Sequence, residues 1–97
     1  MTQTLDPPTI PLDDLETIFA LDDLWAVIVW NDDVNTFQHV IKALVEILHH
    51  TLERAEHLTS LVHTTGKAMV AVRPKDEAVA AMHAFHGRGI HATVDPA

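Results

Sequence analysis

The sequence predicts a small α+β domain in which three helices cover one face of a three-stranded antiparallel sheet. Two observations lead to this prediction: three short apolar runs have the composition of strands, and three longer stretches have helical spacing between them. The chain has 97 residues, enough for a single core, and its 47% hydrophobic content is typical of a globular protein. The predicted element order is β-α-α-β-α-β.

The first strand and helix are separated by an acidic turn. Trp25 to Trp30 is aromatic and β-branched, as expected of a buried strand. Asn31-Asp32-Asp33 follows, and then either Asn35 or Thr36 can cap a helix that ends near His49-His50. The apolar residues of this helix are spaced three and four apart, at Phe37, Val40, Ile41, Leu44 and Leu48.

The second helix begins after Thr51, a residue that can cap it. Glu53 then lies favourably in the first turn, and Gly66 ends the helix. Its predicted inward face consists of Leu52, Ala55, Leu58 and Val62.

The last part of the chain is predicted to form a strand, a helix and another strand. Residues 67–72 form the second strand, Pro74 opens the third helix, and Gly87 closes it. Residues 90–94 form the last short strand. The inward face of the third helix is predicted to carry Ala78, Ala81, Met82 and Phe85.

Residues 1–24 differ in composition from the rest of the chain. They contain three prolines and two pairs of adjacent aspartates. We therefore expect a flexible N-terminal extension at 1–24 and a folded domain at 25–97. The extension also has four apolar residues at helical spacing, Leu12, Leu15, Ile18 and Phe19. This spacing leaves open a short helix that docks on the domain or on a partner.

Charge and composition disfavour several classes of function. The net charge is −8, eight of the 14 acidic residues lie within the first 33 positions, and the first lysine or arginine is Lys42. Nucleic acid and anionic membranes would be repelled by this half of the chain. The sequence has no cysteine, which excludes disulfides, thiolate metal sites and cysteine nucleophiles. A signal peptide and a membrane-spanning run are not recognisable, so a cytoplasmic protein is expected.

One group of residues suggests a binding site. Asn31, Asp32 and Asp33 leave the end of a buried strand, and His63 lies near the end of the second helix. A carboxamide, carboxylates and an imidazole beside an apolar surface suit a free amine next to a hydrophobic side chain. Two simpler interpretations stay open, because Asn and Asp are common turn formers and His63 can be a surface or capping residue.

The eight histidines raise the possibility of a metal site, but no metal and no cofactor is expected. His83 and His86 lie three residues apart on one helix face, yet the histidines are scattered over four elements without a metal-binding pattern. Serine chemistry is not expected either. Ser60 lies three residues from both His57 and His63, but such neighbours on one helix are usually coincidental.

Taken together, three segments resemble the ClpS family of bacterial protease adaptors. They are Val29-Trp30-Asn31-Asp32-Asp33, Leu52-Glu53-Arg54-Ala55 and Val62-His63-Thr64-Thr65-Gly66-Lys67-Ala68. The resemblance implies an adaptor, not an enzyme. Such an adaptor binds N-degron substrates, proteins with a free bulky hydrophobic first residue (Leu, Phe, Tyr or Trp). It then delivers them to the N-terminal domain of a Clp AAA+ unfoldase of the ClpA or ClpC type.

The resemblance also implies roles for individual residues. Asn31, Asp33 and His63 would bind the α-amino group of the substrate, and Asp76 would contact the unfoldase. The pocket for the first side chain would be formed by Val29, Asn35, Phe37, Val40, Thr59, Val62 and Ile90.

The chain departs from the family pattern at several of these positions. Asn35, Thr36 and Phe37 replace the usual Thr, Pro and Met, and Thr59 stands where Met is frequent. Ala81 replaces a common lysine of the unfoldase contact. A Phe at the gate position is expected to narrow or reshape the pocket, and Thr59 to make one wall smaller and more polar.

Two alternatives belong to other classes of function. The same element order is similar to the C-terminal domain of the ribosomal stalk protein, a docking module without a peptide pocket. That module presents basic residues on one helix, whereas the six lysines and arginines here are dispersed. The second alternative is a small metal-dependent hydrolase that uses Asp32, Asp33 and His63.

Overall fold

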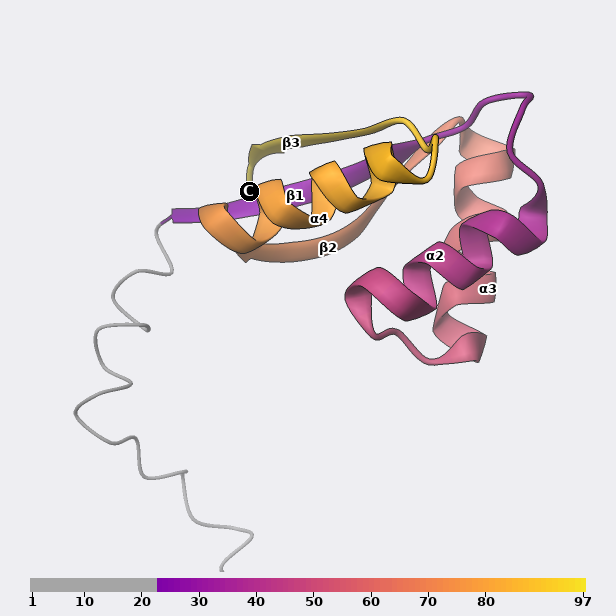
Figure 1. Ribbon diagram of the computed structural model, residues 1–97, viewed down its shortest axis with the longest axis horizontal. Helices are drawn as coiled ribbons and strands as arrows, with labels where there is room; N and C mark the ends of the chain where they lie inside the picture. The colour runs from indigo at the N-terminus through magenta and orange to yellow at the C-terminus, as the bar shows by residue number, and fades with distance from the viewer. Residues whose placement is uncertain (1–22) are drawn as a thin grey trace, which may run out of the picture.

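The computed structural model describes residues 23–97, so the predicted extension at 1–24 lies almost entirely outside the described residues. The described part has the predicted order β-α-α-β-α-β (Figure 1). Its elements are β1 (Leu24–Trp30), α2 (Phe37–Leu48), α3 (Leu52–Thr65), β2 (Lys67–Pro74), α4 (Lys75–Gly87) and β3 (Ala92–Pro96).

The three strands form one antiparallel sheet in the order β2-β1-β3, as predicted. β1 is the central strand: Trp30 lies opposite Lys67 of β2, and Val29 lies opposite Ala92 of β3. A register shift between Val27 and Ile28 marks a bulge against β2. The central position explains why β1 is the most continuously apolar of the three strands, because it has neighbours along both edges and helices beneath it.

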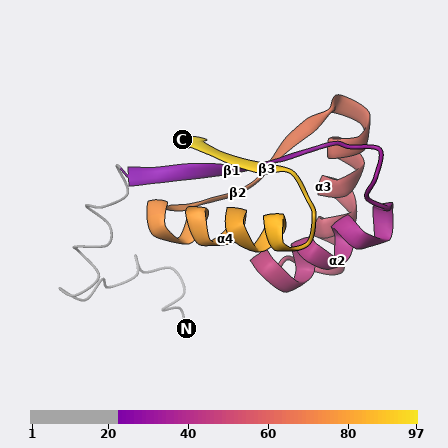
Figure 2. The same ribbon diagram turned by 45° about the horizontal axis from the view of Figure 1, so that its top comes forward.

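All three helices lie on the same side of the sheet (Figure 2). α4 runs lengthwise along the strands, whereas α2 and α3 form a pair towards the end of the sheet where β1 stops and β2 begins (Figures 1 and 2). The α2–α3 pair therefore lies next to the turn that follows Trp30.

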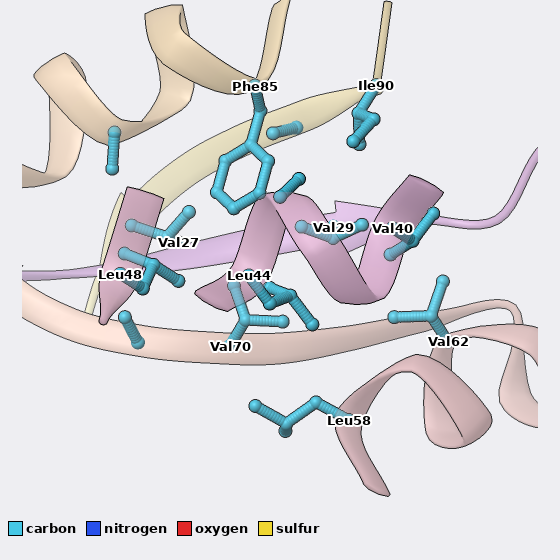
Figure 3. Close-up of a cluster of buried hydrophobic side chains, with 14 of the residues drawn as sticks. Val27, Val29, Val40, Leu44, Leu48, Leu58, Val62, Val70, Phe85 and Ile90 are labelled. Carbon is cyan, nitrogen blue, oxygen red and sulfur yellow. The ribbon is translucent and has the colours of Figure 1, made fainter. Parts of the chain in front are cut away.

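One hydrophobic core joins the sheet to the helices (Figure 3). Val27 and Val29 of β1, Leu44 of α2 and Phe85 of α4 are completely buried. The other large residues of this core are Val40, Leu48, Leu58, Val62, Val70 and Ile90. Most residues predicted to face inward belong to it.

Local signals place the helix ends. Thr36, one of the two predicted caps, accepts a hydrogen bond from the backbone N–H of His39 at 3.1 Å, so it caps α2. Thr51 caps α3 in the same way through Arg54 N. Gly66 ends α3 with a φ of 93°, a left-handed conformation that favours glycine.

The predicted positions of Ile90 and Leu52 are wrong. The last strand begins at Ala92, and Ile90 lies buried in the preceding loop, where its N–H donates to Phe85 O at 3.0 Å. Gly89, with a φ of 75°, turns the chain there. Leu52 is 62% exposed rather than inward, because the first residue of α3 lies at the outer groove between α2 and α3.

A pair of identical substitutions tests this description of the core. Leu44→Ala is expected to lower the free energy of unfolding by about 2–5 kcal/mol, because it leaves a cavity in a fully buried position. Leu52→Ala is expected to change it by less than about 0.5 kcal/mol. Urea denaturation of both variants measures the difference, and equal effects would contradict the assigned burial.

Candidate functional site

A cavity of about 260 Å³ lies beside the turn between β1 and α2, next to α3. Figure 3 shows Val29 of β1, Val40 of α2, Val62 of α3 and Ile90 of the α4–β3 loop at the same end of the core. The residues that line the cavity are Asn31, Asp32, Asp33, Asn35, Thr36, Phe37, Val40, Thr59, Val62 and His63.

A backbone hydrogen bond brings the two halves of the site together. Asn31 N donates to Gly66 O at 2.9 Å, which joins the end of β1 to the end of α3. Gly66 N in turn donates to Val62 O at 3.0 Å, closing the last turn of the helix. His63 belongs to this last turn, so residues 32 positions apart in sequence line one cavity.

The carboxylate of Asp32 builds the turn. Asp32 Oδ1 accepts the backbone N–H groups of Val34 and Asn35, both at 2.8 Å, and Oδ2 accepts the side-chain amide of Asn35 at 2.8 Å. These donors, first of all the Asn35 N–H, hold the pKa of the Asp32 carboxyl below its usual value of 3.8, although burial acts in the opposite direction. The turn-forming interpretation therefore applies to Asp32.

Asn31 and Asp33, on either side of Asp32, are exposed and line the cavity. Asp32 is partly buried and engaged with the backbone, whereas its neighbours present a carboxamide and a carboxylate at the cavity mouth. Of the three consecutive residues, Asp32 therefore stabilises the turn, and Asn31 and Asp33 are exposed at the cavity.

Phe37 and His63 meet across the mouth of the cavity. Their ring centroids lie 6.1 Å apart at an interplanar angle of 79°, an edge-to-face arrangement. Phe37 is 41% exposed, so its predicted place in the buried stripe of α2 is wrong. Phe37 is the first residue of α2 and lies beside the cavity, where no other element covers the apolar face of the helix.

The inner walls of the cavity are apolar except for one hydroxyl. Val40 and Val62 are buried, and Thr59 is the buried polar residue within 23–97. Thr59 Oγ1 donates to Ala55 O at 2.7 Å, so the hydroxyl hydrogen is satisfied within α3.

The structure brings together most of the residues that the family resemblance assigned to a site. Val29 and Ile90 are buried in the core rather than lining the cavity. Asp32 and Thr36 line the cavity as well, although the resemblance gave them no binding role. Their place could have been predicted, because each lies next to residues that the resemblance did assign to the site. Asp76 is exposed in the first turn of α4, outside the cavity.

Within residues 23–97, no group of three histidine, aspartate or glutamate side chains is placed to hold a metal ion. His83 and His86 do contact each other edge to face at 6.0 Å. No helix of the described part is both long enough and apolar enough to cross a membrane.

Comparison with known proteins identifies the class of protein. The family model for ClpS, the ATP-dependent Clp protease adaptor protein, matches residues 20–93. The chain belongs to this family, which is non-catalytic. It is therefore an adaptor of a Clp protease and not an enzyme. The alternative of a metal-dependent hydrolase is wrong, and the family also differs from the ribosomal stalk protein of the other alternative.

Individual relatives agree with this assignment. The ClpS adapter of Corynebacterium efficiens is 33% identical over 84 residues, which cover 87% of this chain and 83% of the relative. That of Corynebacterium glutamicum strain R is 33% identical over 93 residues, covering 96% and 92%. The solved structure of Agrobacterium tumefaciens ClpS2 bound to L-phenylalaninamide shares the fold, with a TM-score of 0.69 at 22% identity, over 78% of this chain and 99% of that one.

The charge of Asp32 gives a pH-dependent prediction. Because the folded state lowers the pKa of Asp32, its carboxylate stabilises the fold above about pH 3.8, and this contribution is lost as pH falls through the lowered pKa. Asp32→Asn should unfold more easily than the natural protein at pH 6. The difference in free energy of unfolding should shrink towards pH 3, measured by urea denaturation at each pH. A difference that stays constant from pH 6 to pH 3 would contradict the assignment.

Proposed function

We propose that the cavity beside the β1–α2 turn binds the first residue of proteins that carry a free, bulky hydrophobic N-terminus. The adaptor then delivers these proteins to a Clp unfoldase of the ClpA or ClpC type, which places its action in the cytoplasm. The observation that carries this proposal is the construction of the cavity, which has apolar walls and a mouth formed by polar acceptor groups.

The mouth suits a protonated α-amino group. Such a group has three N–H donors, and Asn31, Asp33 and His63 offer a carboxamide oxygen, a carboxylate and an imidazole nitrogen. Bonds to a charged donor are stronger than neutral ones, and the carboxylate also balances the charge. The ligand of the A. tumefaciens ClpS2 structure, L-phenylalaninamide, combines a free α-amine with an aromatic side chain, which supports the same chemistry here.

The interior suits the side chain of that first residue. Val40 and Val62 supply apolar walls, Phe37 stands at the mouth, and the Thr59 hydroxyl already donates within α3. Burial of a Leu or Phe side chain contributes about 1.5–3 kcal/mol. Val29 and Ile90, assigned to the pocket by resemblance, belong to the same buried core as Val40 and Val62.

Delivery requires a second surface. Asp76 matches an acidic position that contacts the unfoldase in the family, and it lies on α4, an element that does not line the cavity. Substrate and unfoldase would thus bind to separate elements of one domain. The predicted extension at residues 1–24, which lies almost entirely outside the described part, resembles in length the extension that assists delivery in the family.

Peptide binding tests the proposed pocket. Short labelled peptides that begin with Leu, Phe or Trp should bind in fluorescence anisotropy, and acetylation of the α-amine should weaken binding by about 10- to 100-fold, because acceptor groups are then left unpaired. Asp33→Ala should cause a similar loss. Asp95→Ala, which removes an exposed carboxylate on β3, is the matched control and should bind normally.

Binding that ignores acetylation and the Asp33→Ala substitution would overturn this use of the cavity. The adaptor would then recognise its substrates through another surface.

Removal of residues 1–22 tests the proposed role of the extension. The truncated protein should bind the Phe peptide as tightly as the full chain, because the cavity is built from residues 31–63. It should slow degradation of a Phe-initiated reporter by the Clp protease. Equal degradation rates for the two proteins would contradict a role of this segment in delivery.

A further inference from the structure

The loop between α4 and β3, residues 88–91, is attached to the neighbouring elements at four points. Asn35 Nδ2 donates to Gly89 O at 2.8 Å, and His39 Nε2 lies 2.8 Å from Arg88 O. Arg88 Nη1 donates to Glu46 Oε1 at 2.6 Å, and the backbone N–H of Trp30 donates to His91 O at 2.9 Å. Three of these four attachments come from α2 and the turn before it.

Asn35 connects this loop to the turn that the cavity uses. Its side-chain amide nitrogen lies 2.8 Å from Asp32 Oδ2 and 2.8 Å from Gly89 O. A carboxylate and a carbonyl oxygen both accept, so the NH₂ group must face them and each of its hydrogens has its own partner. A hydroxyl side chain at this position has one hydrogen to donate and can satisfy one of the two acceptors.

His39 strengthens the same attachment one helical turn later. It is half-buried, and its ring nitrogen must donate to Arg88 O, because a backbone carbonyl accepts. The exposed ion pair between Arg88 and Glu46 adds little by itself, since surface pairs contribute about 0–1 kcal/mol. The attachment of the loop to α2 and to the turn before it therefore rests mainly on Asn35 and His39, and the Trp30 N–H holds the loop to β1.

We propose that Asn35 is a positioning residue for the amine-binding mouth of the cavity. It fixes Asp32, and with it the neighbouring Asn31 and Asp33, against the α4–β3 loop, so that the acceptors are held in place before a substrate arrives. This inference rests on the proposed function of the cavity. Asn35 also lines the cavity, so this role is additional to its expected place in the wall of the side-chain pocket.

Conformational entropy explains why the turn benefits from its attachment to the α4–β3 loop. Asn31 and Asp33 are exposed, and exposed side chains on a turn lose conformational freedom when they bind a ligand. A turn that is already fixed reduces this cost, which is the general advantage of preorganised sites. The effect should appear more in recognition of the amine than in burial of the side chain.

The experiment compares two peptides with four proteins. The peptides are a Phe-initiated peptide and its N-acetylated form, and the proteins are the natural chain, Asn35→Ala, His39→Ala and His50→Ala. His50→Ala is the matched control, because His50 Nε2 makes an equivalent contact of 2.7 Å with Val70 O beyond the far end of α2. Circular dichroism at the assay temperature confirms that each variant is folded.

Asn35→Ala is expected to weaken binding of the free peptide by about 3- to 10-fold, the effect of one or two lost hydrogen bonds, and to weaken binding of the acetylated peptide by a clearly smaller factor. His39→Ala should act in the same direction. His50→Ala should change neither. Asn35→Thr, which can restore the single bond to Asp32, should recover part of the lost affinity.

Two results overturn the inference, and they can be told apart from failure of the proposed function. If Asn35→Ala weakens both peptides equally, or no more than His50→Ala does, then Asn35 is an ordinary structural residue. If the natural chain itself fails to bind the free peptide, then the proposed function of the cavity is wrong and the inference falls with it.

Discussion

The hydrogen bond from Asn31 N to Gly66 O is the contact on which the rest of the site depends. It joins the end of the central strand to the end of α3, and so it sets the distance between the acidic turn and His63. Gly66 makes this possible with its left-handed conformation, which lets the chain leave α3 and enter β2 beside β1. The cavity exists because two elements end at the same place.

Adjacent acidic residues serve different purposes at this site. Asp32 uses both carboxylate oxygens to hold Val34 and Asn35, whereas Asp33 remains exposed at the cavity mouth. A single carboxylate could not serve both purposes, because one that is saturated by backbone donors has little capacity left for a ligand. The pair of aspartates therefore separates the carboxylate that stabilises the turn from the carboxylate that is exposed at the cavity.

Local patterns in the sequence predict most of the fold. Thr36, Thr51 and Gly66 act at helix ends through interactions within a few residues, so the sequence nearby is sufficient to find them. Phe37 and Leu52 were wrongly predicted to be buried, because their burial depends on which distant element covers them, and the last strand was predicted to begin too early, at Ile90. Of the candidate site, the family resemblance found most of the residues around the cavity, but not Asp32 or Thr36. It did not find the link from Asn35 to Gly89, which joins positions 54 residues apart.

The walls of the cavity differ in how freely they can adapt. Val40, Thr59 and Val62 are β-branched residues on helices, where one or two χ1 rotamers are strongly preferred, and Thr59 is further fixed by its bond to Ala55 O. Rigid walls lose little entropy when a side chain enters. Phe37 differs, because it is 41% exposed at the first position of α2 and contacts the ring of His63 on one side. Phe37 is therefore the wall residue with the most freedom to move. Because its ring contacts the ring of His63, a movement of Phe37 also changes the surroundings of that imidazole at the cavity.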